Sequence, residues 1–163
     1  MGAERAQPSL RLYLDVQRAS QSSTLPSDTQ LRHWARAALT DLGGTHELTL
    51  RLVDESESAE LNAGYRHKNG PTNVLSFPFE APPGAASRLL GDLIICAPVV
   101  EREAREQGKD VLAHWAHMVA HGILHLRGYD HLTDAEATDM EALETTILAR
   151  LGYVDPYSPG SRC

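Results

Sequence analysis

The stretch HGILHLRGYDH, residues 121–131, constrains what this chain can fold into more than any other segment. Residues four apart lie on one face of a helix, so a helix carrying His121 and His125 points both imidazoles the same way. Gly128 lets the chain leave that helix and turn back, which places His131 as a third imidazole. Three ligands that converge from one side are typical of an open metal site. The spacing therefore predicts a metal site formed by His121, His125 and His131.

Zinc is the metal that three neutral imidazoles suit best, although nickel, copper and iron also accept nitrogen donors. Three protein ligands leave a fourth position for a water molecule, whose pKa zinc lowers toward about 7. The ion would also polarise a carbonyl or phosphoryl oxygen. We therefore expect one zinc ion per chain, used for hydrolysis.

The same spacing matches the metzincin protease pattern H-E-x-x-H-x-x-G-x-x-H at every position but one. Gly122 stands where those proteases carry the glutamate that acts as general base, a step typically worth about 10²–10⁴ in rate. The methionine of their tight turn is missing too, because Met140 falls in a helical pattern. A metalloprotease or amide hydrolase is thus an alternative that needs a base from elsewhere in the chain.

The length of 163 residues suits one domain with a buried core that needs neither disulfides nor a structural metal. We expect a single domain over residues 1–163, ending in a flexible tail from about residue 153. No apolar run approaches the ~20 residues that cross a bilayer, and the first residues lack the apolar stretch of a signal peptide. The expected location is the cytoplasm, where Cys96 and Cys163 stay reduced.

The net charge of −7 argues against bulk attraction of nucleic acid, but it allows a local cationic groove. Arg66, His67 and Lys68 lie together before a Gly-Pro turn. A second basic run, within residues 101–109, alternates with glutamates and is typical of a solvated helix face. From spacing alone, Arg66 fits a surface arginine as well as a catalytic one.

Hydrophobic periodicity predicts four strands and five helices. Two segments alternate apolar and polar residues as half-buried strands do, and two more are apolar strands on either side of a Pro- and Gly-rich loop. The predicted strands are 9–17, 46–53, 73–77 and 89–96. The predicted helices run from a cap at Ser27 or Asp28 to Gly43, over 54–66, from 97 to about 107, over 111–126, and from Thr133 to about Leu151. The fold class is therefore a single α+β domain, with a small mixed four-stranded sheet and about five helices.

Capping boxes are predicted for two of these helices, from Asp54 with Glu57 and from Thr133 with Glu136. The metal site falls on the long helix in the C-terminal half of the chain and on the turn that follows it.

Three further residues are candidates for supporting the ligands. His117 precedes His121 by one helical turn, and the apolar residues around it suggest a buried structural residue or a hydrogen-bond partner of a ligand. Asp130 could orient an imidazole or equally cap the turn. Asp92 is a charge inside an apolar strand, which is costly unless it is hydrogen-bonded or functional.

Four stretches resemble the YbeY family, bacterial endoribonucleases that act as ribosomal RNA maturation factors. Besides HGILHLRGYDH, they are LNAGYRHKNGPTNVLSFPFE, LLGDLIIC, and AHWAHMVAHGILHLRGYDH running on into MEALE and LGYVDPY. The resemblance covers the chain in order from about Leu48 to Tyr157, and the region before it carries no such motif.

That resemblance implies a zinc-dependent, single-strand-specific endoribonuclease in maturation of the 3′ end of 16S rRNA and in ribosome quality control. It implies His121, His125 and His131 as zinc ligands and Arg66 as the cleft arginine needed for RNA cleavage, so Arg66 and His121 are the expected catalytic residues. The expected partners are single-stranded RNA, rRNA and the ribosome or its small-subunit proteins, with no membrane and no DNA.

The nucleophile is left open by the sequence. Either a zinc-bound hydroxide or the 2′-hydroxyl of the RNA can attack, while a guanidinium stabilises the charge on the phosphate. A third class of function is a non-catalytic ribosome-associated zinc protein. In that class removal of zinc would unfold the domain, whereas loss of a catalytic zinc would leave it folded.

Overall fold

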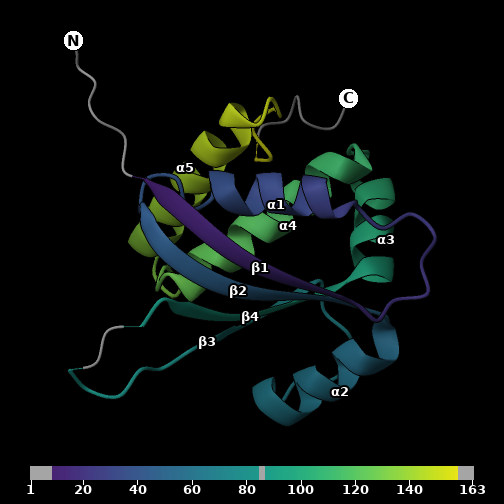
Figure 1. Cartoon of the computed structure of the whole chain (residues 1–163). Helices are drawn as coiled ribbons and strands as arrows, with labels where there is room; N and C mark the ends of the chain where they lie inside the picture. The colour runs from purple at the N-terminus through teal and green to yellow at the C-terminus, as the bar shows by residue number, and fades with distance from the viewer. Residues whose placement is uncertain (1–8, 85–86, 158–163) are drawn as a thin grey trace.

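The structure, a computed structural model, describes residues 9–84 and 87–157 (Figure 1). It confirms the predicted α+β fold, with a mixed four-stranded sheet and five helices among the described residues. In chain order these elements are β1 (Leu10–Arg18), α1 (Asp28–Ala37), β2 (Gly44–Val53), α2 (Glu55–Arg66), β3 (Val74–Pro78), β4 (Leu89–Cys96), α3 (Ala97–Gln107), α4 (Val111–Leu126) and α5 (Asp134–Arg150).

The sheet has the strand order β1-β2-β4-β3, so β1 and β3 are its edge strands. Strands β1, β2 and β4 are parallel, and β3 pairs antiparallel with β4. Strand β4 is buried on both faces over residues 93–96, between α4 and α2, whereas β2 alternates buried and partly exposed residues. Leu50 of β2 and Leu93 and Ile95 of β4 are accordingly fully buried.

Helices α1, α4 and α5 lie on one face of the sheet, and α2 lies on the other (Figure 1). The larger core cluster fills the first layer and includes Trp115 and Ile123 of α4. A smaller cluster on the α2 side contains Leu75, Ile94 and Cys96. Helix α4 packs against the sheet and against α1, α3 and α5, as expected of a helix that is apolar nearly all round.

Two helix starts follow the sequence prediction closely. Ser27 caps α1, and the predicted capping box of Thr133 and Glu136 is present at the start of α5. Helix α1 ends at Ala37, earlier than predicted, because residues 38–42 form turns before Gly43 adopts a positive φ of 62°.

The predicted capping box at the start of α2 is wrong. Asp54 is the N-cap residue, but its carboxylate caps no amide of α2. It accepts hydrogen bonds from the Ser20 hydroxyl and the Gln21 amide instead, and Glu57 pairs with Arg51 at 2.6 Å. Asp54 therefore binds a segment 34 residues away and Glu57 binds the preceding strand, β2, so the two carboxylates do not form a capping box.

The segment after α5 packs onto the domain over its described part. Tyr153 contacts the larger core cluster, and the Tyr157 hydroxyl donates a hydrogen bond to Glu144. Residues 153–157 of the expected flexible tail thus make ordered contacts, and the remainder, 158–163, lies outside the described residues.

Among the described helices, none combines the length and the apolar character needed to cross a bilayer.

The close packing of α4 on β4 can be tested at Gly122. A Cβ atom there would lie 2.2 Å from Cδ1 of the fully buried Leu93, whereas a Cβ at Gly64 on α2 would meet nothing within 4 Å. Both Gly→Ala changes gain helix propensity, and only Gly122→Ala overpacks the core, which typically costs about 1–3 kcal/mol. We expect urea unfolding to find Gly122→Ala about 1–3 kcal/mol less stable than the matched Gly64→Ala. Equal stability of the two variants would contradict this packing.

Candidate active site

The structure brings the three predicted histidines together at the C-terminal end of α4. His121 and His125 lie one turn apart on α4, and Gly128, with a φ of 102°, turns the chain so that His131 faces them. The ring centroid of His131 lies 5.9 Å from that of His121 and 5.2 Å from that of His125. One nitrogen of each imidazole lies within 4.8 Å of the others, so the group can hold a metal ion.

Hydrogen bonds fix the tautomers of His121 and His125. The Nδ1 of His121 donates to a Glu144 carboxylate oxygen at 2.6 Å, and the Nδ1 of His125 donates to the Tyr129 carbonyl at 3.0 Å. Because neither acceptor carries a proton, the neutral form of each ring has its proton on Nδ1 and its lone pair on Nε2.

The two Nε2 atoms lie 3.2 Å apart, close to the roughly 3.3 Å between two nitrogens on one tetrahedral zinc. Burial, and then the neighbouring imidazoles, lower the pKa of His125, which keeps its ring neutral. In their neutral forms the two rings would face each other through lone pairs, an arrangement that a shared cation stabilises. The residues therefore fit a metal ion, although their assignment as zinc ligands stays a prediction.

Glu144 is the residue of this site that the sequence analysis missed. It lies on α5, it is 0 % exposed, and its carboxylate accepts hydrogen bonds from His117, His121 and Tyr157. Burial raises the pKa of Glu144, but the hydrogen bonds from His117 and His121 outweigh it and lower the pKa to about 2. The carboxylate therefore stays ionised and fixes the orientation of the His121 ring through its Nδ1.

A signal for Glu144 is present in the sequence. The buried stripe of α5 contains Met140, Ile147 and Leu148, and Glu144 falls between them at helical spacing. A carboxylate in an apolar stripe requires hydrogen-bond donors from another element. The stripe therefore shows that Glu144 has buried partners, but not which ones.

His117 is buried one helical turn before His121. Its Nε2 donates to Glu144 at 2.6 Å, and burial lowers its pKa. His117, His121 and Glu144 form a second group whose ligand atoms lie within 4.8 Å of one another. Because hydrogen bonds already join these atoms, we interpret the group as the outer support of the three-histidine site.

The two aspartate candidates behave differently from each other. Asp130 borders the site, and its carboxylate accepts a hydrogen bond from the His131 backbone amide at 2.7 Å, so it caps the turn and orients no imidazole. Asp92 does not reach the site. Its side chain is exposed on the face of β4 that is buried only from Ile94 onward. Because the side chain is exposed, its charge is tolerated in an otherwise apolar strand.

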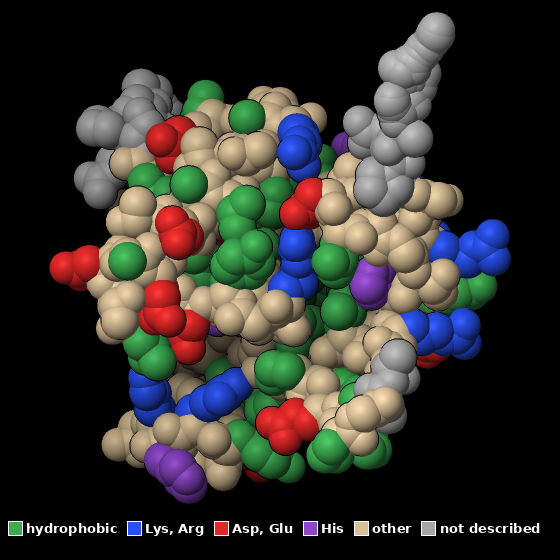
Figure 2. Space-filling view, turned by 90° about the vertical axis from the view of Figure 1, so that its left-hand side faces the viewer, with side chains coloured by type: hydrophobic (Ala, Val, Ile, Leu, Met, Phe, Trp, Pro, Cys, Tyr) green, Lys and Arg blue, Asp and Glu red, His purple; other side chains and the backbone are tan. Residues whose placement is uncertain are grey.

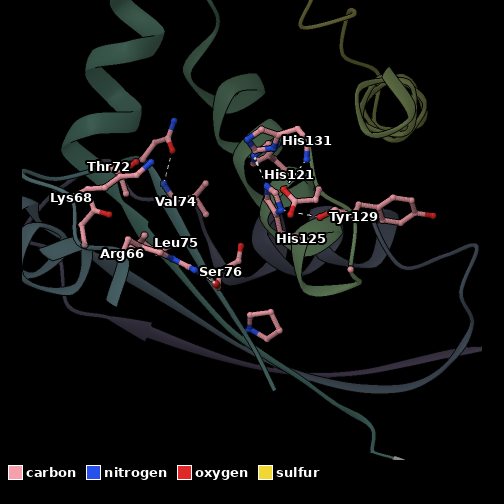
Figure 3. Close-up of a pocket in the computed structure, with 15 residues that line it drawn as sticks. Arg66, Lys68, Thr72, Val74, Leu75, Ser76, His121, His125, Tyr129 and His131 are labelled. Carbon is pink, nitrogen blue, oxygen red and sulfur yellow. Dashed lines mark hydrogen bonds between the residues drawn. The ribbon is translucent and has the colours of Figure 1, made fainter. Parts of the chain in front are cut away.

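A cleft of about 600 Å³ separates the histidines from the C-terminal end of α2 and from β3. Figure 3 shows the three imidazoles on one wall and Arg66, Lys68 and Ser76 on the other. The Arg66 guanidinium donates to the Ser76 carbonyl and lies 5.3 Å from the Phe77 ring centroid. Arg66 forms no ion pair with any described residue, so its charge remains available for an anion in the cleft.

Buried polar side chains of α2 hold the loop that carries the cationic wall. Asn62 donates to the Gly70 carbonyl at 2.9 Å, and Ser58 donates to the Thr72 carbonyl at 3.0 Å. His67 ends α2 in the left-handed conformation, with a φ of 57°. The positions of Arg66 and Lys68 are therefore set by backbone anchors on both sides.

The charges of the molecule are unevenly distributed. On the face shown in Figure 2, one group of Lys and Arg side chains lies at the lower left, below a group of Asp and Glu side chains, and further Lys and Arg side chains lie in the middle and on the right. A net charge of −7 therefore coexists with a cationic wall on the cleft.

The cleft lacks an obvious general base for peptide hydrolysis. Among its described lining residues the one carboxylate is Asp130, which binds the His131 amide. A glutamate at position 122 has no room, because Leu93 fills the space beside Gly122. The observed site thus weakens the protease alternative.

Two comparisons with known proteins bear on this chain. The family model described as Endoribonuclease YbeY matches residues 16–152. The solution structure of TM1509 from Thermotoga maritima is similar in fold, with a TM-score of 0.54 and 23 % sequence identity. That similarity covers 88 % of this chain and 99 % of the Thermotoga protein.

Glu144 can be tested as the residue that positions His121. Carboxylates that hold a ligating imidazole typically contribute about 10–100-fold to metal affinity. We expect Glu144→Gln to weaken zinc binding by about that factor, measured by competition with a chromophoric chelator on protein whose folding is checked by circular dichroism. Glu141→Gln, which changes an exposed carboxylate on the same helix, should bind zinc like the unmodified protein. Unchanged affinity in Glu144→Gln would rule out this role.

Proposed function

This chain belongs to the YbeY family of endoribonucleases, and from that premise we propose that it is a zinc-dependent, single-strand-specific endoribonuclease. The observation that carries the proposal is the cleft, in which three convergent imidazoles face an arginine without an ion-pair partner among the described residues. We assign it to maturation of the 3′ end of 16S rRNA and to ribosome quality control in the cytoplasm. Its partners would be rRNA and proteins of the small ribosomal subunit.

His121, His125 and His131 would hold the zinc ion, two of them through Nε2. When bound there, zinc would supply Lewis acidity toward a phosphoryl oxygen and lower the pKa of a water molecule. Glu144 and the Tyr129 carbonyl keep His121 and His125 in the tautomer that such binding requires. The three-ligand set leaves a position for substrate or water, as in catalytic zinc sites.

Arg66 would bind the scissile phosphodiester. Its guanidinium presents planar donors that match two phosphate oxygens, and its bond to the Ser76 carbonyl orients it at the cleft wall. Charge builds up on the equatorial phosphate oxygens during cleavage, so a fixed cation stabilises the transition state more than the ground state. Lys68 lines the same cleft and offers a second cation for a neighbouring phosphate.

RNA also carries its own nucleophile, the 2′-hydroxyl. Attack by this group needs no carboxylate at position 122, which agrees with a cleft whose one described lining carboxylate caps a turn. Attack by an activated water is the other route, and the two routes leave different product ends.

The roles of Arg66 and His121 predict different defects in their variants. Arg66→Ala should retain metal and fold but cleave a single-stranded rRNA fragment about 10²–10³-fold more slowly, as when one charge-stabilising donor is lost. His121→Ala should lose both metal and cleavage. Arg102→Ala removes an exposed arginine that pairs with Glu55 on another surface and should cleave at the normal rate. Normal cleavage by folded Arg66→Ala would contradict the proposal.

Metal removal separates a catalytic zinc from a structural one. Because the main core cluster consists of apolar side chains and includes none of the three histidines, we expect chelator-treated protein to keep its circular dichroism spectrum while RNA cleavage is lost. Added zinc should restore cleavage at about one ion per chain. Unfolding of the metal-free protein would instead favour a non-catalytic zinc protein.

A further inference from the structure

We propose that Tyr65 is a stacking site for an unpaired base of the RNA, next to the phosphate that Arg66 binds. This inference rests on the proposed function and deepens it, because it names the part of the substrate recognised beside the cleft. Four observations support it, namely the exposure of Tyr65, its fixed ring, its adjacency to Arg66 and the position of β3.

Tyr65 occupies a sheet-facing position but remains uncovered. The face of α2 that packs on the sheet contains Ser58, Leu61 and Asn62, and Tyr65 continues that stripe one turn later. Because β3 is an edge strand, no further strand covers the outer side of the ring. Tyr65 is consequently 67 % exposed, although it is a large aromatic residue.

The ring of Tyr65 is held in place by Phe77. The two ring centroids lie 5.4 Å apart at an interplanar angle of 74°, an edge-to-face contact. The Arg66 guanidinium lies over the same Phe77 ring, at 5.3 Å from its centroid. The contact with Phe77 therefore restrains the tyrosine ring while most of it stays exposed, so that binding a base orders little that is not already ordered.

The aromatic pair continues the cleft around the edge of β3. Ser76 and Pro78 line the cleft, and Phe77 between them points to the α2 side of the sheet, as alternate strand residues do. Arg66 spans this edge, with its guanidinium on the Ser76 carbonyl and over Phe77. A strand of RNA whose phosphate lies on Arg66 therefore has its base within reach of the adjacent Tyr65.

Stacking on an aromatic side chain requires an unpaired base and tolerates every base type. A duplex keeps its bases stacked on one another, so it would gain nothing from Tyr65. The site therefore supplies a physical reason for a single-strand preference that a cationic wall alone does not give, because phosphates are present in both kinds of RNA.

The test measures RNA binding by the zinc-loaded, full-length protein. The probe is a short single-stranded RNA with 2-aminopurine beside the cleavage site and a 2′-deoxy sugar at that site, and a gel run after each titration checks that it stays uncut. Stacking is worth about 1–3 kcal/mol per base, so Tyr65→Ala and Tyr65→Leu should each weaken binding about 5- to 150-fold. They should also abolish the quenching of 2-aminopurine, while Tyr65→Phe should bind and quench like the unmodified protein.

Tyr13 provides the matched control. It is a 50 % exposed tyrosine on the opposite edge strand, with the Arg88 guanidinium 5.4 Å from its ring centroid. Tyr13→Ala should therefore leave binding and quenching unchanged. The salt dependence separates stacking from charge, because Tyr65→Ala should keep the slope of log K against log salt, whereas Lys68→Ala should reduce it.

Normal affinity and quenching in folded Tyr65→Ala, with binding still reduced in Lys68→Ala, would overturn the stacking site and leave the proposed function standing. An equal loss of affinity in Tyr13→Ala would overturn it as well, because the effect would then not be local. If the unmodified protein neither binds nor cuts single-stranded RNA, the proposed function fails and the stacking site fails with it.

Discussion

The histidine side of the cleft depends on one buried carboxylate, that of Glu144. It joins three parts of the chain, because its donors are His117 and His121 of α4 and Tyr157 of the segment after α5. A buried charge costs several kcal/mol unless hydrogen bonds satisfy it, and here three donors do so. The orientation of His121 is therefore coupled to how α5 and the C-terminal segment pack on α4. The geometry of the three-histidine site and the stability of this half of the molecule therefore depend on the same contacts.

Features set by short-range periodicity could be predicted from the sequence. The four strands and five helices follow from hydrophobic periods of two and 3.6 residues. The spacing of His121 and His125 corresponds to one helical turn. The capping box at Thr133 is equally local. Partners distant in the chain could not be predicted this way, because Glu144 meets His121 from 23 residues away and Asp54 binds Ser20 from 34 residues away. Both carboxylates form tertiary hydrogen bonds, which a local sequence pattern does not predict.

Strand order explains the other residues that the sequence could not place. Asp92 and Phe77 are paired across β4 and β3, on the face that α2 covers only in part. Where α2 is present, Ile94 and Cys96 are buried, and where it ends, Asp92 is exposed. The exposure of Tyr65 has the same origin, since α2 extends over an edge strand. The sequence shows that Asp92 lies in an apolar strand and that Tyr65 lies on the sheet-facing side of its helix. It does not show which strand forms the open edge of the sheet, because that depends on the order of all four strands.

Ser76 links the two walls of the cleft, which come from distant parts of the chain. Its carbonyl accepts the Arg66 guanidinium, and its hydroxyl donates to the Gly122 carbonyl of α4 at 3.1 Å. Gly122 follows His121 directly, so a buried residue of β3 sets the separation between the cation and the imidazoles. The absence of a Cβ at Gly122 allows α4 to approach β4 closely enough for this bond, since Leu93 fills the space that a side chain would need. The glycine at the position of the protease glutamate therefore has a structural role of its own, because it brings the helix that carries His121 and His125 within hydrogen-bond distance of the strand that anchors Arg66.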